Sequence, residues 1–168
     1  MTIAVTMAVC AGLSVVPAAA QRKPEPPKAE APKQYEDWVH ECEASPNQKQ
    51  TCFISQSMMA GDGTRLIKIS IGPLGPKGET YTRVMLPLGI YLPAGAAYQV
   101  GGTPQVHLVI HTCMPEGCLA SAPISPAALK AFGDGKTFAI GVVPTGSDKA
   151  VTIGVSVKGF KAALASLK

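Results

Sequence analysis

Short runs of alternating apolar and polar residues fill most of the chain after its first 35 positions. From Val151 to Val157, Val or Ile stands at every second position, with polar residues or glycine between them. Ile67, Ile69 and Ile71 repeat the same period. A period of two places alternate side chains on opposite faces of a strand. We therefore predict strands with one face toward a core and one toward solvent.

Eight such runs are rich in Val, Ile, Thr and Tyr, and Gly, Pro, Asn or Asp separate them. They span residues 38–42, 51–57, 65–71, 81–86, 97–100, 106–111, 137–143 and 150–157. Many short strands with turn residues between them are typical of antiparallel all-β folds. The predicted fold class is all-β, either a β-sandwich or a partly closed barrel of about eight strands.

One or two short helices are expected in addition. Ser125 is a good N-cap, Pro126 suits the first helical position, and Gly133 can end a helix in a left-handed conformation. These signals predict a helix over residues 125–132. Residues 160–167 place three large apolar side chains on one helical face, which predicts a second helix that covers the sheet.

The first 20 residues carry no charge and end in three alanines, which is typical of a secretory signal peptide cleaved after Ala20. The apolar run is too short to span a bilayer, and Cys10 lacks the surroundings of a lipoprotein anchor. Residues 21–34 combine four prolines with alternating charges, which predicts an extended tether. Residues 35–168 then form a single domain, and we expect the mature protein in the periplasm, at the outer membrane or outside the cell.

Four cysteines remain once the leader is removed. They form two local pairs, Cys42 with Cys52 and Cys113 with Cys118. Disulfides persist in extracytoplasmic compartments, and a Pro-Asn or Pro-Glu-Gly turn signal lies between the members of each pair. Of the three connectivities that four cysteines allow, local pairing is therefore predicted. The alternative is a thiol-redox accessory or other periplasmic enzyme using Cys113 and Cys118, which a reactive thiol in the purified protein would reveal.

Other chemistry finds little support. His107 and His111 lie four residues apart on a predicted strand, about 13 Å along its axis, which is too far for one zinc ion. His40 has no predictable position relative to them. The chain contains no Gly-x-Ser-x-Gly elbow and no phosphate-binding loop. We expect no metal, no cofactor and no catalytic activity. Of the formal net charge of +4, the tether carries +2 (four bases minus two acids), and the +2 left on the domain is too weak to indicate nucleic-acid binding.

Acidic and aromatic residues are further candidates for ligand-binding groups. Four carboxylates cluster in residues 36–43, where they predict a charged, solvated sheet edge rather than a glycosidase pair. Trp38, Tyr81, Tyr91 and Tyr98 are of the kind that stack on a sugar or a peptide, and core roles are at least as well supported.

A loop of prolines and glycines over residues 86–95 flanks Ile90, Tyr91 and Leu92. Such a loop can hold apolar side chains at the surface, where partners bind them. The alternative is that the three side chains fill the end of the sheet. Ile90, Tyr91 and Leu92 are therefore the candidate binding tip, although the reading in which they fill the end of the sheet is the better supported of the two.

Several motifs in this order resemble the invasion-associated locus B family of exported Gram-negative bacterial proteins. The resemblance rests on Trp38 with Cys42 and Cys52, the segments 86–89 and 92–95, the segment 113–120, Leu129 and the segment 158–160. It covers nearly the whole domain and leaves out the tether. It implies a β-rich periplasmic or outer-membrane-associated protein, linked in some members to entry into host cells, with no established enzymatic activity. An envelope or host-surface protein is the partner it implies, and the oligomeric state stays open.

Overall fold

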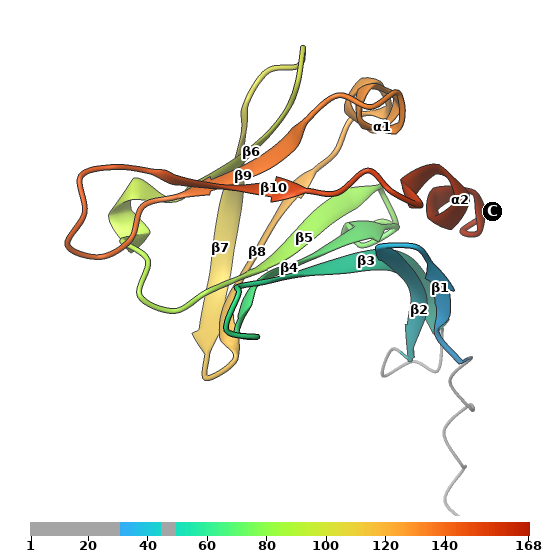
Figure 1. Cartoon of the computed structure of the whole chain (residues 1–168). Coiled ribbons are helices and arrows are strands. Elements are labelled where there is room, and N and C mark those ends of the chain that lie inside the picture. Colours follow the sequence, from blue (N-terminus) through green and yellow to red (C-terminus); the bar gives the residue numbers. More distant parts are fainter. Residues whose placement is uncertain (1–30, 45–49) are drawn as a thin grey trace, which may run out of the picture.

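The computed structural model describes residues 31–44 and 50–168, and in this part of the chain ten strands form one antiparallel sheet. The order across the sheet is β1-β2-β3-β4-β5-β8-β7-β6-β9-β10. The sheet curls so that β6, β9 and β10 lie over β3, β4 and β5, with β7 and β8 joining the two layers (Figure 1). The strands are β1 (Lys33–Tyr35), β2 (Trp38–Ala44), β3 (Gln50–Met59), β4 (Arg65–Gly72), β5 (Tyr81–Leu86), β6 (Ala96–Val100), β7 (Val106–Met114), β8 (Gly117–Pro123), β9 (Phe138–Val142) and β10 (Val151–Val155).

This single curved sheet is a half-barrel, so the all-β prediction is confirmed in its partly closed barrel form. All eight predicted strands are present, and β1 and β8 are additional. β8 escaped notice because Gly, Ala and Ser, which have low strand propensity, make up most of it. It nevertheless lies in the middle of the sheet, between β5 and β7. β1 begins at Lys33, two residues before the predicted start of the domain.

The predicted signal peptide and most of the predicted tether lie outside the described residues. Within the described ranges, no helix combines the length and the apolar character needed to cross a membrane.

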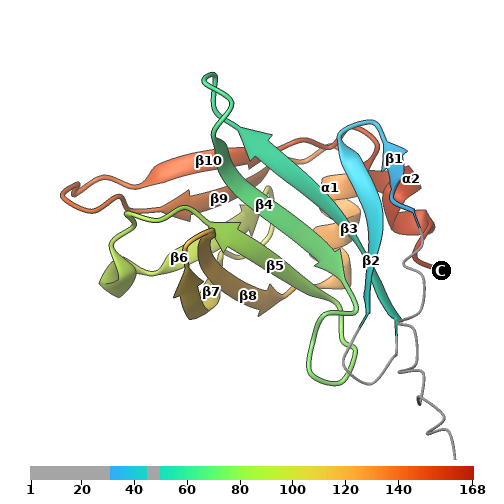
Figure 2. The ribbon, with the colours of Figure 1, turned by 90° about the horizontal axis from the view of Figure 1, so that it is seen from below.

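The two helices lie at the same end of the half-barrel (Figures 1 and 2). In α1 (Pro126–Gly133) the hydroxyl of Ser125 accepts a hydrogen bond from the N–H of Ala128 at 3.1 Å, as expected of an N-cap. The end of α1 differs from the prediction, because Gly133 is still helical and the left-handed residue is Gly135, with φ 88°. The N–H of Asp134 still bonds to the carbonyl of Lys130, as within a helix, so the chain leaves the helical path at Gly135, two residues after the predicted position. The second helix, α2 (Phe160–Ala165), contacts β1 and β2 and ends before its predicted limit at residue 167.

An aromatic cluster fills the space between the helices and the two ends of the sheet. Ring centroids are 4.5 Å apart for Phe132 and Phe160, 5.2 Å for Trp38 and Phe160, and 5.2 Å for Phe132 and Phe138. Tyr98 joins the cluster through Phe138 at 5.3 Å. Trp38 and Tyr98 are both buried, so they belong to the core and are not free to stack on a ligand.

Hydrogen bonds that join Gln56 of β3 to the segment after β10 close the half-barrel. We call this group, which consists of Gln56, Ser156, Asp37 and Trp38, the latch. The side-chain amide of Gln56, only 4% exposed, accepts from the N–H of Ser156 at 2.8 Å and donates to its carbonyl at 3.4 Å. It also donates to the carbonyl of Asp37 at 3.2 Å. The indole N–H of Trp38 donates to the same Ser156 carbonyl at 2.9 Å. The side chain of Gln56 thus makes hydrogen bonds to the backbone that a neighbouring strand would otherwise make. It does so where β3 approaches the segment that follows β10.

Candidate functional site

The loop between β5 and β6 carries exposed apolar side chains on a buried anchor. Ile90 is 8% exposed and belongs to the core, whereas Tyr91 is 49% and Leu92 50% exposed. Leu88 is exposed as well. We call Leu88, Tyr91 and Leu92 the tip surface. Each interpretation of the sequence therefore holds for part of the candidate tip. Ile90 fills the end of the sheet, whereas Tyr91 and Leu92 face solvent.

Backbone hydrogen bonds fix the loop to the segment after β9. The N–H of Tyr91 donates to the carbonyl of Val143, and the N–H of Thr145 donates to the carbonyl of Gly89, each at 2.7 Å. Ile90 forms an isolated β-bridge with Pro144 between these two bonds. The tip surface is therefore held by a short, two-sided ladder, which lowers the entropy lost when a partner binds it.

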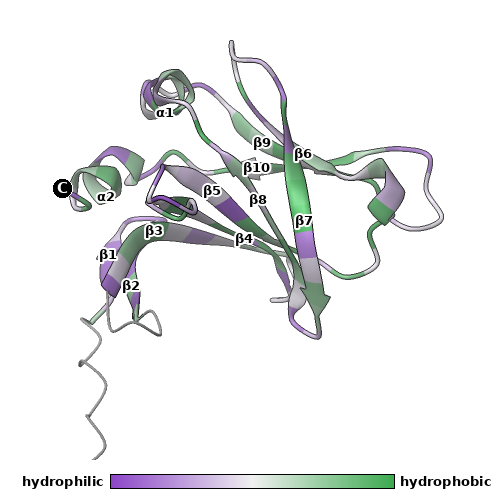
Figure 3. Cartoon of the chain, turned by 180° about the vertical axis from the view of Figure 1, so that it is seen from behind, coloured by the Kyte–Doolittle hydropathy of each residue, from purple (hydrophilic) through white to green (hydrophobic). Residues whose placement is uncertain are grey.

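The turn into β6 depends on proline and glycine. A single 3-10 turn, η1 (Leu92–Ala94), contains Pro93 and ends at Gly95, whose φ is 70°. Glycine adopts this positive φ without steric cost. The loop lies at the end of the sheet opposite α2, and Figure 3 shows hydrophobic residues within it.

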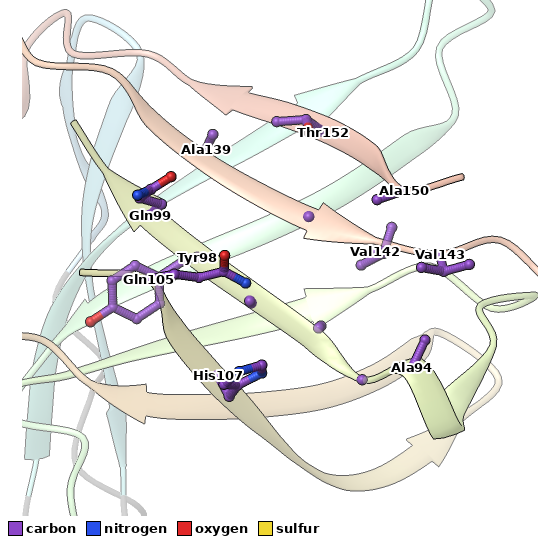
Figure 4. Close-up of a pocket in the computed structure, with 14 residues that line it drawn as sticks. Ala94, Tyr98, Gln99, Gln105, His107, Ala139, Val142, Val143, Ala150 and Thr152 are labelled. Carbon is purple, nitrogen blue, oxygen red and sulfur yellow. The ribbon is translucent and has the colours of Figure 1, made fainter. Parts of the chain in front are cut away.

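A shallow pocket of about 270 Å³ adjoins the tip surface (Figure 4). Ala94 and Gly95 line the pocket on the side of the tip surface, and small residues of β6 and β9 line its floor, among them Ala97, Ala139 and Gly141. Polar side chains surround it: Gln99, Gln105, His107 and Thr152. Pockets for small-molecule ligands usually measure about 300–1,000 Å³, so this one suits a single side chain of a partner better than a metabolite.

Both predicted cysteine pairs are bonded in the structure. Cys42 and Cys52 face each other across β2 and β3, and Cys113 and Cys118 do so across β7 and β8. The Cys113–Cys118 bond joins the two strands close to the turn of a tight hairpin, one pair before Met114 and Gly117, and Cys118 is buried. Each bond therefore secures two neighbouring strands.

The three histidines lie in two places. His107 and His111 are both exposed on β7, where the ring of His111 pairs with the hydroxyl of Ser121 at 2.8 Å. Val109, between them, is 63% exposed and marks the same outer face. His40 lies on β2 beside the Cys42–Cys52 disulfide, a proximity that the sequence pattern did not reveal.

Within the described residues, β1 pairs only with residues 38–40 of β2, so the acidic segment is a sheet edge beyond the end of β1, at Glu41 and Glu43. Glu36, Asp37 and Glu43 are exposed, and Glu41 is half-buried. Three of its four carboxylates have separate partners: Glu41 pairs with Lys68 at 2.6 Å, Glu43 with Arg83 at 3.7 Å, and Asp37 accepts from the hydroxyl of Ser156 at 2.6 Å.

Glu41 is the carboxylate with the most polar contacts in this group. Partial burial opposes its ionisation, but the hydrogen bonds from Lys68 and Ser55 and the charge of Lys68 outweigh it, so its pKa lies below the ordinary value. The role of Glu41 is therefore an ion pair between β2 and β4.

Sequence reasoning missed the pocket, the latch and Leu88. The first two join residues from distant strands, and Leu88 stands in the same proline and glycine loop as the predicted tip. Two adjacent alanines in β6 and the alternating Ala139 and Gly141 of β9 were the available signal for the pocket floor.

Comparison with known proteins agrees with this architecture. The family model "Invasion associated locus B (IalB) protein" matches residues 38–168. The chain belongs to the IalB family. Two invasion protein B homologs of Brucella abortus, from strain 2308 and from biovar 1 strain 9-941, are each 25% identical over 130 residues, which covers 77% of this chain and 75% of theirs. The crystal structure of invasion associated protein B from Bartonella henselae shares the fold, with a TM-score of 0.71, 21% identity, and coverage of 82% of this chain and 95% of that one.

The IalB match begins at Trp38, the first residue of β2. It therefore includes both disulfides, the tip surface, the latch and both helices. Apart from β1 and the segment that holds Glu36 and Asp37, the features described above lie in the part of the chain that carries the family resemblance.

Proposed function

We propose that this IalB protein is exported to the cell envelope and acts there by binding a partner protein, not by catalysis. The observation that carries the proposal is the tip surface, where Tyr91 and Leu92 are about half exposed on a loop fixed by Ile90. Rigid, exposed aromatic and aliphatic side chains beside a small pocket are the usual centre of a protein interface. The partner is an envelope protein or, as the names of the Brucella and Bartonella relatives suggest, a host-surface protein.

Export is supported by the uncharged, alanine-ended leader and by the two disulfides. Cell fractionation followed by sequencing of the mature N-terminus tests it. We expect a periplasmic or outer-membrane fraction and a first residue of Gln21. Full-length protein in the cytosol contradicts export.

A double substitution of the tip surface tests the binding role. Tyr91→Ser with Leu92→Ser removes apolar area that already faces solvent, so the free energy of unfolding should change by less than about 1 kcal/mol. Association is measured by crosslinking the purified protein to intact envelopes and to cultured animal cells, with the crosslinked partner identified by mass. We expect the yield of this crosslinked product to be at least tenfold lower for the double variant than for the wild type.

Val109→Ser is the matched control, because Val109 is also an exposed apolar residue but lies on β7, away from the tip. It should retain the crosslink. Equal loss in both variants, or retention of the same crosslink by the tip variant, refutes the assignment of the tip. Unfolding of the tip variant also refutes it, because it would mean that these side chains serve the core.

A further inference from the structure

His40, Cys42 and Cys52 bring three metal-ligating atoms together at the far end of the sheet from the tip surface. His40 and Cys42 lie two residues apart on β2 and share a face, and Cys52 is the cross-strand partner of Cys42 on β3. The three atoms lie within 4.8 Å of one another, and all three residues are half-buried. The Nε2 atom of His40 is 3.5 Å from the Sγ atom of Cys42.

Helix α2 and the residue after it determine how the His40 ring is held. The Nδ1 atom lies 2.7 Å from the hydroxyl oxygen of Ser166, and that hydroxyl donates its only proton to the carbonyl of Ala163 at 2.6 Å. The Ser166 oxygen must therefore accept from Nδ1–H. The lone pair of the neutral ring is then on Nε2, which faces the sulfur. A metal-binding histidine is oriented in this way, by a hydrogen bond from its other ring nitrogen.

The distance between ring and sulfur already suits zinc. Zinc–sulfur bonds of about 2.3 Å and zinc–nitrogen bonds of about 2.0 Å at a tetrahedral angle separate the two ligand atoms by about 3.5 Å. The observed separation of Nε2 and Sγ is 3.5 Å. Two thiolates and one imidazole are a soft donor set that favours zinc over magnesium or calcium, and they leave a fourth position for water.

We propose that the reduced Cys42–Cys52 pair and His40 form a zinc site, so that this disulfide is a switch between a covalent staple and a metal-binding state. An external dithiol reduces the bond by thiol–disulfide exchange: it supplies two electrons and two protons, yields two cysteine thiols and becomes a disulfide itself. Zinc then displaces one proton from each thiol as the two thiolates bind. His40 contributes its Nε2 lone pair and releases no proton.

The second disulfide provides an internal control. Among residues 31–44 and 50–168, His40, Cys42 and Cys52 are the one group of three Cys, His or acidic residues with this spacing. Within the same two ranges, the Cys113–Cys118 pair lacks such a partner. The double substitution Cys113→Ser with Cys118→Ser therefore leaves the proposed site complete, and it also ensures that the only thiols in the mature chain are Cys42 and Cys52.

The experiment uses this double variant of the mature chain, oxidised or reduced with a phosphine that is then removed. Zinc binding is followed by calorimetry, and cobalt is used as a spectroscopic probe of thiolate ligation. We expect one zinc per reduced chain, none per oxidised chain, and thiolate-to-cobalt charge-transfer absorption in the reduced form alone. Absence of zinc binding by the reduced chain overturns the proposal.

Two substitutions distinguish the folded site from a chain that binds zinc through its cysteines after unfolding. His40→Ala should weaken zinc binding at least tenfold, and Ser166→Ala should weaken it about tenfold by releasing the ring. Ser166 lies 126 residues from His40 in the chain, so it can influence His40 only in the folded protein. Zinc affinity that is unchanged in both variants overturns the proposal, whatever the stability of the reduced form.

Discussion

Gln56→Leu provides a direct test of how the half-barrel is closed. Leucine has nearly the volume of glutamine and suits a buried site, but it can neither donate nor accept a hydrogen bond. The carbonyl of Ser156 keeps its bond from Trp38 at 2.9 Å. The N–H of Ser156 and the carbonyl of Asp37 lose the partners that they have at 2.8 Å and 3.2 Å.

The expected loss of stability in Gln56→Leu comes from these two backbone groups. A buried polar group left without a partner costs about 1–3 kcal/mol, but Asp37 is exposed, so water can replace the glutamine at its carbonyl. The N–H of Ser156 therefore carries most of the cost, and we expect a destabilisation of about 2 kcal/mol. For a domain of this size that corresponds to a decrease in Tm of roughly 6–10 °C.

Urea unfolding of the oxidised chain from Gln21 onward, followed by tryptophan fluorescence, measures the effect, because Trp38 is the only tryptophan and belongs to the latch. Gln99→Leu is the matched control, since Gln99 is exposed and its amide donates only to the carbonyl of Thr103 within the adjoining turn. It should change the free energy of unfolding by less than about 0.5 kcal/mol. If Gln56→Leu is as stable as Gln99→Leu, the latch does not hold the barrel closed and the reasoning is wrong.

Two further predictions concern a charge and a turn. The pKa of Glu41 is lowered in the folded protein, so the Glu41–Lys68 pair stabilises the fold. The stabilisation is about 1 kcal/mol or less, because the pair is partly solvated. It is complete above the ordinary pKa of 4.5 and is lost as the pH falls through the lowered pKa of the folded protein. Denaturation at several pH values should therefore show Glu41→Gln less stable than wild type near neutral pH and equal to it in acid, and a constant difference contradicts this. Gly159→Ala should cost at least 3 kcal/mol in the same assay, because φ is 77° and the added Cβ would lie 1.9 Å from the carbonyl oxygen of Tyr35. Gly146→Ala is the control, because Gly146 has φ 80° with open space around it, and it should cost about 1 kcal/mol. An equal loss of stability in the two variants would show that a backbone shift relieves the close approach at Gly159.

The predictions that the structure confirmed came from local signals. Alternation within single strands determined which faces are buried, and Ser125 marked the start of α1 because its side chain caps an N–H three residues on. The cysteine pairs lie 10 and 5 residues apart, within the span of one hairpin, so the same short segments that predict the turns also bring the sulfurs together. A family pattern spread over the domain added the architecture that these local signals left open.

The arrangement of the strands and the sites between them was decided by the tertiary structure. β8 lacks strand-forming side chains and is a strand because β5 and β7 pair with it on both sides. The contacts of Gln56 with Ser156 and of His40 with Ser166 join residues 100 and 126 positions apart. Periodicity along a chain specifies which side of a strand meets the core, because that depends on each residue's own polarity. It does not specify which strands become neighbours, because that depends on packing and hydrogen bonding between segments whose separation in sequence carries no record of their distance in space.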